Sequence, residues 1–443
     1  MNDNIEKHVI GAARRAYEAQ YDLRQRRQRY KRFTYGDQWG DMVRDRDGAL
    51  VREGDLMAAG GRQPLTNNLI RRLVKTIVGR WRTIAAESRR YDDPALHARA
   101  NALAEIDARM LEEFLISGCA IQRVSHSDGI DGGVRVDNVS PRDFFVNAFR
   151  DPRGHDIRLA GMLHEMTPIE LAARFGSGDA ARIAMLLHRG QAVAGGDDAA
   201  IPADILTASN GDEDFMHARP GYCRVLEVWT LDSAMNPECT AIAMGWHCRW
   251  LLPDGTLLAE YHSPYRHRSN PFAIKFYPLT DGEVHSFVED VIEQQKYINR
   301  LIVLIDKMMG ASAKGVLLFP ITQKPSVVTW EEIAERWSRT DGVIPINGRG
   351  EDMPTQVAGN GADAGAHQLL SLELKLFEDV SGVSNALLGQ TSNGNGGAGL
   401  FDAQVRNSTI ALADIFDTFE SFLGDRDRLI WQCNILNHKT IRP

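Results

Sequence analysis

The chain has 443 residues and a formal net charge of -8, with 43% hydrophobic and 25% charged residues, a balance typical of folded soluble proteins with several structural units. No run of about 18 apolar residues occurs and the N-terminus lacks an apolar core, so we expect no transmembrane helix, no secretory signal and assembly in a cytoplasm. The five cysteines are scattered without a C-x-x-C pair, which favours reduced thiols over a disulfide framework.

The N-terminal part of the chain predicts helices separated by turns. Gly36 lies in an aromatic-Gly-Asp-Gln-Trp turn that would end the first helix, whose face is strongly basic. Residues 41–63 are polar and rich in glycine, so we expect a loop there. Asn67 or Asn68 would cap the next helix. The predicted helices cover residues 5–33, 69–86 and, after Pro94, about 95–117.

The middle of the chain alternates between strand and helix patterns. Thr167 would cap a short helix that has Pro168 in its first turn and ends near Phe175. A block of regularly alternating strands follows, in which a Pro-Asp-Gly-Thr turn at 253–256 joins two strands. We expect strands and turns over 120–147, a companion helix over about 179–188, a linker over 190–217, and strands over 222–230, 242–252 and 257–261.

The most regular helical pattern of the mid-chain covers residues 284–309, where apolar side chains recur every three or four positions. At about 1.5 Å per residue, such a helix would span roughly 40 Å. Gly424 is a potential break in a long amphipathic segment nearer the C-terminus. We expect short strands over 313–347 around a helix at 330–338, a flexible loop over 348–366, a helix over 367–380 and the amphipathic segment over about 400–438.

Charge is unevenly distributed along the chain. Residues 62–90 carry eight Lys or Arg against one acid, whereas residues 351–425 carry eleven Asp or Glu against two bases. A basic patch for nucleic acid is one interpretation. Solvated faces, or complementary faces that meet between subunits, are the other, and we favour them because opposite blocks on one chain suit head-to-tail contacts in a ring.

Motifs for enzymatic chemistry are missing from the sequence. There is no P-loop motif, no H-E-x-x-H motif and no G-x-S-x-G motif, so we expect no enzyme and no cofactor. The one loose group of potential metal ligands lacks the tight paired spacing that zinc sites prefer, so we interpret its members as ordinary strand and loop residues. These residues are Cys239, His247, Cys248, His262 and His267.

Five segments, in order along the chain, resemble the portal proteins of tailed bacteriophages. Together they span about residues 30–408, and their order makes the resemblance specific. The segments are RYKRFTYGDQW at 29–39, PLTNNLIRRLVKTIVG at 64–79, MTPIELAARFG at 166–176, NPFAIKFYPLTDGEVHSFVEDVIEQQKYINRLI at 270–302 and EDVSGVSNALLGQTSNGNGGAGLFDAQVRNS at 378–408.

The resemblance implies an α+β subunit, mainly helical with β-rich segments, that has wing, stem, clip and short crown regions. Carried over by position, it assigns a region to each part of this chain. The expected regions are an N-terminal wing at 1–221, a β-rich clip with adjoining wing at 222–270, a stem helix at 271–312, a wing α/β part at 313–347, a tunnel loop at 348–366 and wing-to-crown helices at 367–443.

The same resemblance implies a function without catalysis. It predicts a homo-oligomeric ring, usually of twelve subunits, at a capsid vertex of the virion, with a channel through which double-stranded DNA is packaged and ejected. The expected partners are terminase, head-completion or adaptor proteins, scaffolding protein and major capsid protein, with no membrane. The alternative hypothesis is a nucleic-acid-binding adaptor that uses the basic segments 14–32 and 62–90.

Three groups of candidate functional residues follow from these assignments. A channel should not grip DNA, because phosphate contacts by Lys and Arg create strong, salt-dependent affinity. Channel or stem candidates are Glu289, Glu293, Lys296 and Arg300. Tunnel-loop candidates are Arg349, Glu351, Asp352, Asp363 and His367. Oligomer-contact candidates are Arg71, Arg72, Lys75 and Trp81.

Overall fold

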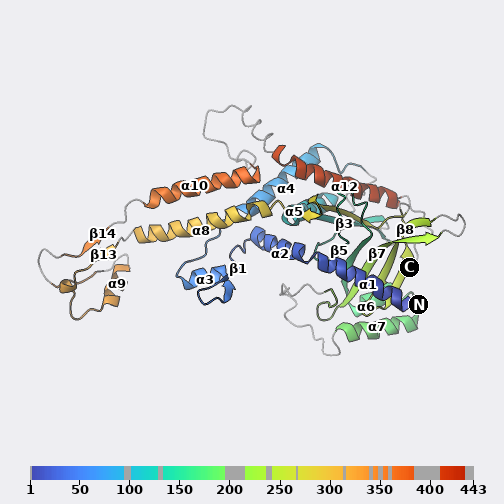
Figure 1. Ribbon diagram of the computed structural model, residues 1–443, viewed down its shortest axis with the longest axis horizontal. Coiled ribbons are helices and arrows are strands. Elements are labelled where there is room, and N and C mark those ends of the chain that lie inside the picture. The colour runs from blue at the N-terminus through green and yellow to red at the C-terminus, as the bar shows by residue number, and fades with distance from the viewer. Residues whose placement is uncertain are drawn as a thin grey trace. The chain divides into compact units, whose positions relative to one another are not determined.

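The computed structural model describes residues 2–93, 101–127, 133–194, 215–235, 242–265, 268–312, 316–338, 343–347, 353–357, 362–383 and 410–434. The chain divides into two compact units, whose elements are labelled in Figure 1. Unit 1 consists of residues 1–31, 72–289 and 393–443, and unit 2 consists of residues 32–71 and 290–392. Helices and strands are mixed, which is compatible with the predicted α+β class. All strand pairs among the described residues are antiparallel.

The N-terminal helix predicted over 5–33 is in fact two helices, α1 (Asn2–Ala19) and α2 (Tyr21–Tyr35). The break lies beside Arg24, which is buried, lies over the Tyr17 ring and donates a hydrogen bond of 2.7 Å to the Tyr17 carbonyl. Such a bond satisfies one of the carbonyls that a helix leaves open at its C-terminus. The predicted stop at Gly36 is confirmed, since α2 ends at Tyr35 and Gly36 has a φ of 106° that favours glycine.

The largest sheet of unit 1 has five strands in the order β5-β6-β7-β8-β9. Its core is formed by side chains of α1, including Val9 and Tyr17, against Leu226, Val228 and Leu251 of the sheet. The predicted strands over 222–261 are confirmed, and they pair with an earlier strand rather than forming a sheet of their own. The strands are β5 (Phe144–Val146), β6 (Leu159–Met166), β7 (Cys223–Met235), β8 (Ile242–Leu251) and β9 (Leu257–His262).

A second sheet of unit 1 has the order β10-β3-β4, and the helices α5 and α12 contact it. Gly118 follows α5 directly with a φ of 72°, and a Cβ there would lie 2.8 Å from a Val284 methyl group, so only glycine fits. Unit 1 also contains the small hairpin β11–β12. These elements are α5 (Leu103–Ser117), β3 (Cys119–Ser127), β4 (Gly133–Asn138), β10 (Phe272–Phe276), β11 (Pro278–Thr280), β12 (Glu283–Val284) and α12 (Ala413–Asn434).

Two further helices of unit 1 test the predicted capping residues. Helix α6 (Pro168–Phe175) begins as predicted, with Thr167 and Glu170 in a reciprocal capping box. Helix α7 (Ala180–Ala194) continues beyond 188 into the range predicted as a linker, of which 195–214 lies outside the described residues. Helix α12 passes through Gly424 without a break, so the predicted interruption is wrong.

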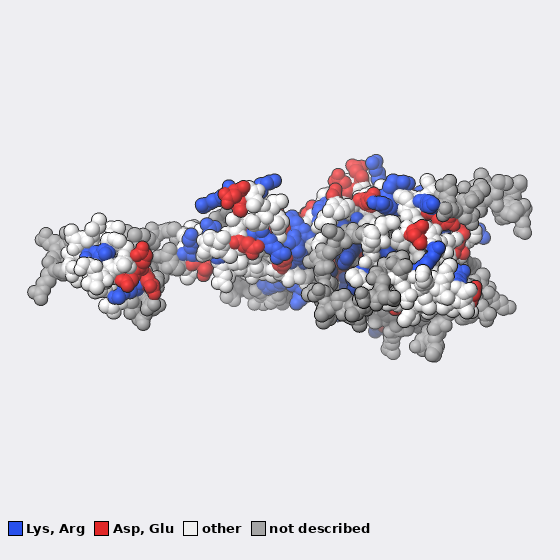
Figure 2. Space-filling view, turned by 90° about the horizontal axis from the view of Figure 1, so that it is seen from below, with Lys and Arg blue, Asp and Glu red and all other residues white. Residues whose placement is uncertain are grey.

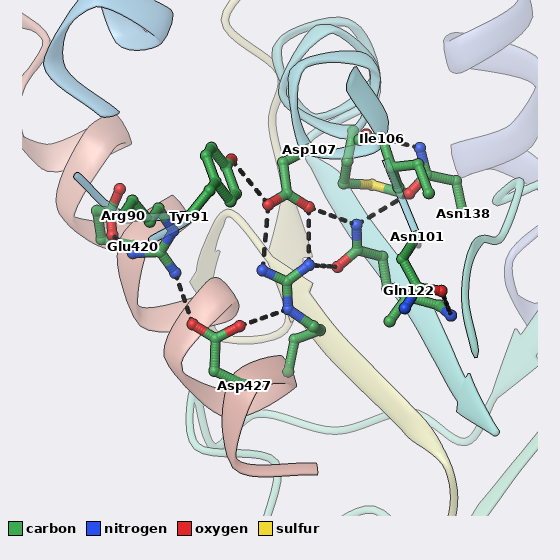
Figure 3. Close-up of polar contacts among 12 residues, drawn as sticks. Arg90, Tyr91, Asn101, Ile106, Asp107, Gln122, Asn138, Glu420 and Asp427 are labelled. Carbon is green, nitrogen blue, oxygen red and sulfur yellow. Dashed lines mark hydrogen bonds and ion pairs between the residues drawn. The ribbon is translucent and has the colours of Figure 1, made fainter. Parts of the chain in front are cut away.

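Helix α12 is attached to the second sheet of unit 1 through a buried ion pair (Figure 3). The side chains of Arg426 and Asp107 are both 0% exposed, and their two hydrogen bonds measure 2.9 and 3.1 Å. Gln122 of β3 also donates to Asp107, at 3.0 Å, and Asp427 accepts from the Arg426 Nε at 2.6 Å. Since every charge in this network has a partner, the network can hold α12, α5 and β3 together without an uncompensated buried ion.

Removing one member of this pair should strongly destabilise the protein. Asp107→Asn leaves Arg426 buried beside a neutral group, which should cost about 3–5 kcal/mol of unfolding free energy. The matched control is Asp425→Asn, which removes an exposed ion pair with Arg428 and should cost at most about 1 kcal/mol. Urea unfolding followed by tryptophan fluorescence measures both; equal midpoints for the two variants would contradict this role of Asp107.

Unit 2 contains short elements where a loop was predicted over 41–63, so that prediction is wrong. Residues 42–52 form a hairpin in which Val43 pairs with Val51, and Asp45 accepts two backbone hydrogen bonds in its turn. The sequence signal is weak because both strands have only three residues. The elements are β1 (Met42–Arg44), β2 (Leu50–Arg52) and α3 (Glu53–Ala59).

The longest helix among the described residues is α8 (Glu289–Ser312), which begins five residues later than predicted because Val284 pairs within the β11–β12 hairpin. Helix α4 (Leu69–Glu87) begins in unit 2 at the predicted residue. Helix α10 (Ala362–Ser381) begins inside the predicted loop 348–366, so Asp363 and His367 are helical. The other elements are β13 (Val316–Leu318), the 3-10 helix η3 (Ile321–Gln323), α9 (Trp330–Ser338), as predicted, and β14 (Thr355–Val357).

Candidate functional site

Three sequence segments that carry the resemblance meet in one buried cluster of amide side chains in unit 2. Gln38 comes from the turn after α2, and Gln295 and Asn299 come from successive turns of α8; all three are at most 1% exposed. The Asn299 Nδ2 donates to the Gln38 Oε1 at 2.6 Å, and the Gln295 Nε2 donates to the Asn299 Oδ1 at 3.0 Å. We call these three residues, with Asn68, the amide cluster.

The amide cluster satisfies the open backbone groups of two helix ends. The Gln295 Oε1 accepts hydrogen bonds from the backbone N–H groups of Leu69 and Ile70 at 2.9 and 3.3 Å. Asn68, one of the two predicted caps, accepts from the Arg71 N–H at 3.0 Å, so it caps α4. Gln38 and Asn68 also donate to the last carbonyls of α2, those of residues 33 and 34, at 2.9 and 3.0 Å.

Gln295 is a functional position to which sequence reasoning assigned no role. It lies four residues after Val291 and three before Ile298, so it falls on the apolar stripe of α8. A neutral amide on such a stripe must have buried hydrogen-bond partners. The sequence could therefore have indicated that Gln295 holds another segment in place. The identity of the partners, 225 or more residues away in sequence, was not accessible.

Replacing Gln295 should therefore destabilise unit 2. Gln295→Leu leaves the N–H groups of Leu69 and Ile70 without their acceptor, which should cost about 2–4 kcal/mol of unfolding free energy. Gln294→Leu is the matched control, because the Gln294 Oε1 has no hydrogen-bond partner within the described residues. Thermal and urea unfolding, with hydrogen exchange at the start of α4, measure the effect; an equal loss in both variants would refute the capping role.

Three of the four charged channel candidates on α8 lie beside groups of opposite charge. Within unit 2, the Lys296 Nζ lies 3.2 Å from Asp41, and the Arg300 Nε donates to Glu53 at 2.9 Å. Glu289, assigned to unit 1, lies 3.3 Å from His285. Glu293 is exposed. Asp41 and Glu53, which flank the β1–β2 hairpin, thus neutralise Lys296 and Arg300, so these two bases form no free basic row on α8.

Helices α8 and α10 are the two arms of one hairpin. Strand β13 begins four residues after α8 ends, β14 ends five residues before α10 begins, and Val316 pairs with Val357. This pairing brings the C-terminus of α8 close to the N-terminus of α10, so the chain leaves along one helix and returns along the other (Figure 1). With 24 and 20 residues, the arms extend for about 36 and 30 Å.

The described residues between 316 and 357 form the tip of this hairpin and expose several large apolar side chains; we call them the tip module. Val327 is 89% exposed and Ile321 is 82% exposed. Figure 2 shows largely uncharged surface at this end, with acidic side chains gathered at one margin. Exposed apolar clusters of this kind mark interaction surfaces. The other exposed apolar residues of the module are Leu318, Trp330, Val343 and Met353.

The predicted tunnel-loop residues are not brought together by the described part of the structure. Arg349, Glu351 and Asp352 lie outside the described residues. Asp363 and His367 belong to α10, where His367 is exposed. The grouping of these five residues remains a prediction from the resemblance.

The predicted oligomer-contact residues separate into exposed and buried ones. Arg72 and Lys75 are exposed on α4, with no ion-pair partner among the described residues. Arg71 lies over the Tyr35 ring at 4.5 Å. Trp81, by contrast, is 1% exposed, packs against Phe419 of α12 and donates to Glu420, so it leaves no surface for another subunit.

The basic segment 62–90 and the acidic segment 351–425 meet within unit 1. Arg90 lies 2.6 Å from Glu420 and 2.9 Å from Asp427, which is two residues beyond the acidic segment. Part of the charge asymmetry is therefore compensated inside the chain. The exposed members of the basic segment that have no ion pair among the described residues stay available to an acidic surface; they are Arg62, Arg72, Lys75 and Arg89.

Glu227 of unit 1 is a buried carboxylate that is surrounded by hydrogen-bonding and charged side chains. The Glu227 carboxylate is 0% exposed and lies 2.8 Å from His164 and 3.1 Å from Arg123, while the Trp229 indole donates at 3.0 Å. Burial by itself would raise the pKa of Glu227, but Arg123 and His164 lower it to about 2. A carboxylate with its oxygens so fully occupied stabilises the sheet and has little basicity to offer a reaction.

This low pKa predicts a specific acid sensitivity. The group titrates near pH 4.5 when unfolded and near pH 2 when folded, so its contribution is present above pH 4.5 and is lost as pH falls toward 2. Over that window the wild type should lose up to about 3 kcal/mol more than Glu227→Gln. Unfolding at stepped pH tests this, with the exposed-site variant Glu331→Gln expected to follow the wild type; parallel curves for wild type and Glu227→Gln would contradict it.

The loose group of potential metal ligands does not assemble in the described residues. The rings of His247 and His262 stack at 4.5 Å, and the His247 nitrogens lie 3.3 Å from Asp232 and 3.4 Å from Glu260. Burial lowers the pKa of His247. Among the described residues no group of three ligands is placed to hold a metal, and Cys239 and His267 lie outside them.

The described cysteines offer no reactive thiol. Cys119, Cys223, Cys248 and Cys433 are all buried, and burial raises the pKa of each thiol.

Within the described part of the chain, no helix is long and apolar enough to span a bilayer. The features that stand out in the described residues are a helical hairpin, paired charges and exposed apolar side chains.

Comparison with known proteins identifies the kind of structural protein. It belongs to a class of non-enzymatic components of the bacteriophage virion. Residues 11–433 match the family described as phage P22-like portal protein, so the chain belongs to that portal family. None of the curated proteins matches the chain. The resemblance inferred from the five sequence segments is thereby confirmed.

Proposed function

We propose that copies of this chain form a ring at a capsid vertex, with a central channel through which double-stranded DNA enters during packaging and leaves during ejection. The observation that supports this most directly is the α8–α10 hairpin with exposed apolar residues, in a chain of the portal family. Such surfaces need covering by another protein chain. Twelve copies are the expected number for this family.

We propose a changed assignment of regions within the subunit. The two arms α8 and α10 form the stem, and the tip module at their far end takes the role of the clip. The earlier assignment of the clip to 222–270 is less favoured, because those strands pair with β6 and share the core of the five-stranded sheet with α1. We assign this sheet and α12 to the wing.

The charges of α8 suit a channel that lets DNA slide. Lys296 and Arg300 are paired with acids, so they contribute little phosphate affinity. Each phosphate neutralised by a free base adds to a salt-dependent affinity that would slow translocation. The net charge of -8 per subunit, repeated around a ring, acts in the same direction.

The tip module is the proposed docking surface for partners outside the capsid. Its exposed residues Ile321, Val327 and Val343 offer apolar contact, and its acidic helix α9 can select basic partners. We assign the terminase motor and the head-completion or adaptor protein to this end. Scaffolding and major capsid proteins would contact the wing.

Electron microscopy and native mass spectrometry of the purified full-length chain test the ring. We expect particles with a central hole and a mass that is an integral multiple of the 49.3 kDa subunit. Assembly into phage heads gives a second readout, in which the chain should occupy one vertex. A chain that remains monomeric in both settings overturns the proposal.

The alternative, a nucleic-acid-binding adaptor, is favoured by the exposed bases of segment 62–90, among which Arg72 and Lys75 lie three residues apart on α4. The other basic segment is largely occupied: Arg24 is buried, Arg27 pairs with Glu113, and Arg14 pairs with Glu18. If the adaptor hypothesis held, Arg72→Ala with Lys75→Ala would reduce the salt slope of duplex binding by about two. We expect weak binding and an unchanged slope, measured by fluorescence anisotropy at several salt concentrations.

A further inference from the structure

We propose that an apolar stripe on α10 of one copy packs against a different stripe on α8 of the next copy. The inference rests on the proposed ring and specifies its lateral contact. The observation behind it is that the two arms of one hairpin expose apolar side chains at helical spacing and at matching levels. Both stripes lie in unit 2.

The first stripe consists of Leu372, Leu376 and Val380 on α10. These residues are four positions apart, so they line one face of the helix over about 12 Å. They are 51%, 39% and 46% exposed. A surface helix normally turns such a row toward its own core, and here Phe377 is the buried position of the same segment. The stripe is thus a second apolar face that the described part of the subunit leaves uncovered.

The second stripe consists of Tyr297 and Leu304 on α8. They are seven residues apart, which places them on one face about 10 Å from each other. They are 42% and 49% exposed, whereas the opposite face holds the buried Gln295 and Ile298. Arg300 lies between them on the same exposed face, and its side chain remains 51% exposed despite its bond to Glu53.

The two stripes lie at matching levels of the hairpin. Because β13 pairs with β14, the end of α8 at Ser312 and the start of α10 at Ala362 define a common level. Measured from there, Leu304 and Tyr297 lie at about 12 and 22 Å, and Leu372 and Val380 lie at about 15 and 27 Å. Copies that stand at equal height in a ring therefore bring the α10 stripe of one subunit to the α8 stripe of its neighbour.

Charge complementarity favours this pairing over contact between like helices. The second half of α10 carries Glu373, Glu378 and Asp379 against one base, Lys375. At the same levels the exposed face of α8 presents Arg300, whose guanidinium is bonded to Glu53 and is still 51% exposed. Two α10 faces would bring acids against acids, whereas α10 against α8 places them near this guanidinium. A contact between two different surfaces is head-to-tail, which is the kind that closes rings.

The first test changes the α10 stripe in the full-length chain. Leu376→Glu places a charge in the contact and should raise the protein concentration needed for ring assembly about tenfold or more. Ile169→Glu is the matched control, at an apolar residue of α6 that is 74% exposed and belongs to unit 1. Native mass spectrometry over a dilution series measures assembly, and circular dichroism verifies that both variants fold.

The second test captures the contact covalently and does not depend on destabilisation. A double variant, Leu304→Cys with Leu372→Cys, should give a ladder of disulfide-linked multimers under mild oxidation, up to the whole ring, and each single variant should give none. Rings without a ladder, together with normal assembly of Leu376→Glu, overturn this pairing and leave the proposed ring intact. Dimers from Leu372→Cys alone also overturn it, because they show α10 against α10. A wild-type chain that forms no ring overturns the proposed function and the pairing together.

Discussion

The capping of α4 by a glutamine of α8 is the interaction on which the arrangement of unit 2 depends. The Gln295 Oε1 takes two backbone N–H groups of α4, while Asn299 holds the Gln38 side chain that closes the end of α2. Neutral amides suit this role, because a buried charge would require an equally buried counter-ion. The network binds three segments into one body, and its strength does not vary with pH or salt as an ion pair would.

In unit 1, buried ion pairs rather than neutral amides hold the elements together. Arg426 and Asp107 are both fully buried, and Glu227 is enclosed by Arg123, His164 and Trp229. In each case all charges face partners, so the groups hold elements together and offer no reactivity. The result fits a family without catalysis. It also explains why clusters of titratable residues in this chain are poor guides to function.

The surfaces that remain for function are apolar or weakly charged. In the hairpin of α8 and α10, Lys296 and Arg300 are paired with acids, the outer stripes are apolar and the tip module exposes several apolar side chains. In the proposed ring, such a hairpin would contact other protein chains and bind the phosphates of a passing duplex only weakly. The proposed assembly and the proposed translocation therefore make compatible demands on the same pair of helices.

Local features of the chain were predictable from sequence, and the portal family with them. Thr167 caps its helix, Gly36 ends α2 and Asn68 caps α4, because each effect acts over a few residues and depends on residue type. Two of the wrong predictions have a clear physical reason. The hairpin at 42–52 was missed because its strands have only three residues each, and α8 starts later than predicted because Val284 pairs with a neighbouring strand.

Tertiary structure alone decided which side chains are available for function. Lys296, Arg300 and Trp81 are residue types that often bind a partner. In the folded chain, however, Lys296 is paired with Asp41, Arg300 with Glu53, and Trp81 packs against Phe419. Conversely, Leu372 and Leu376 have the pattern of core residues but are exposed. Sequence periodicity identifies a helix face and its polarity, whereas burial depends on which distant segment covers that face, and that information lies only in the folded chain.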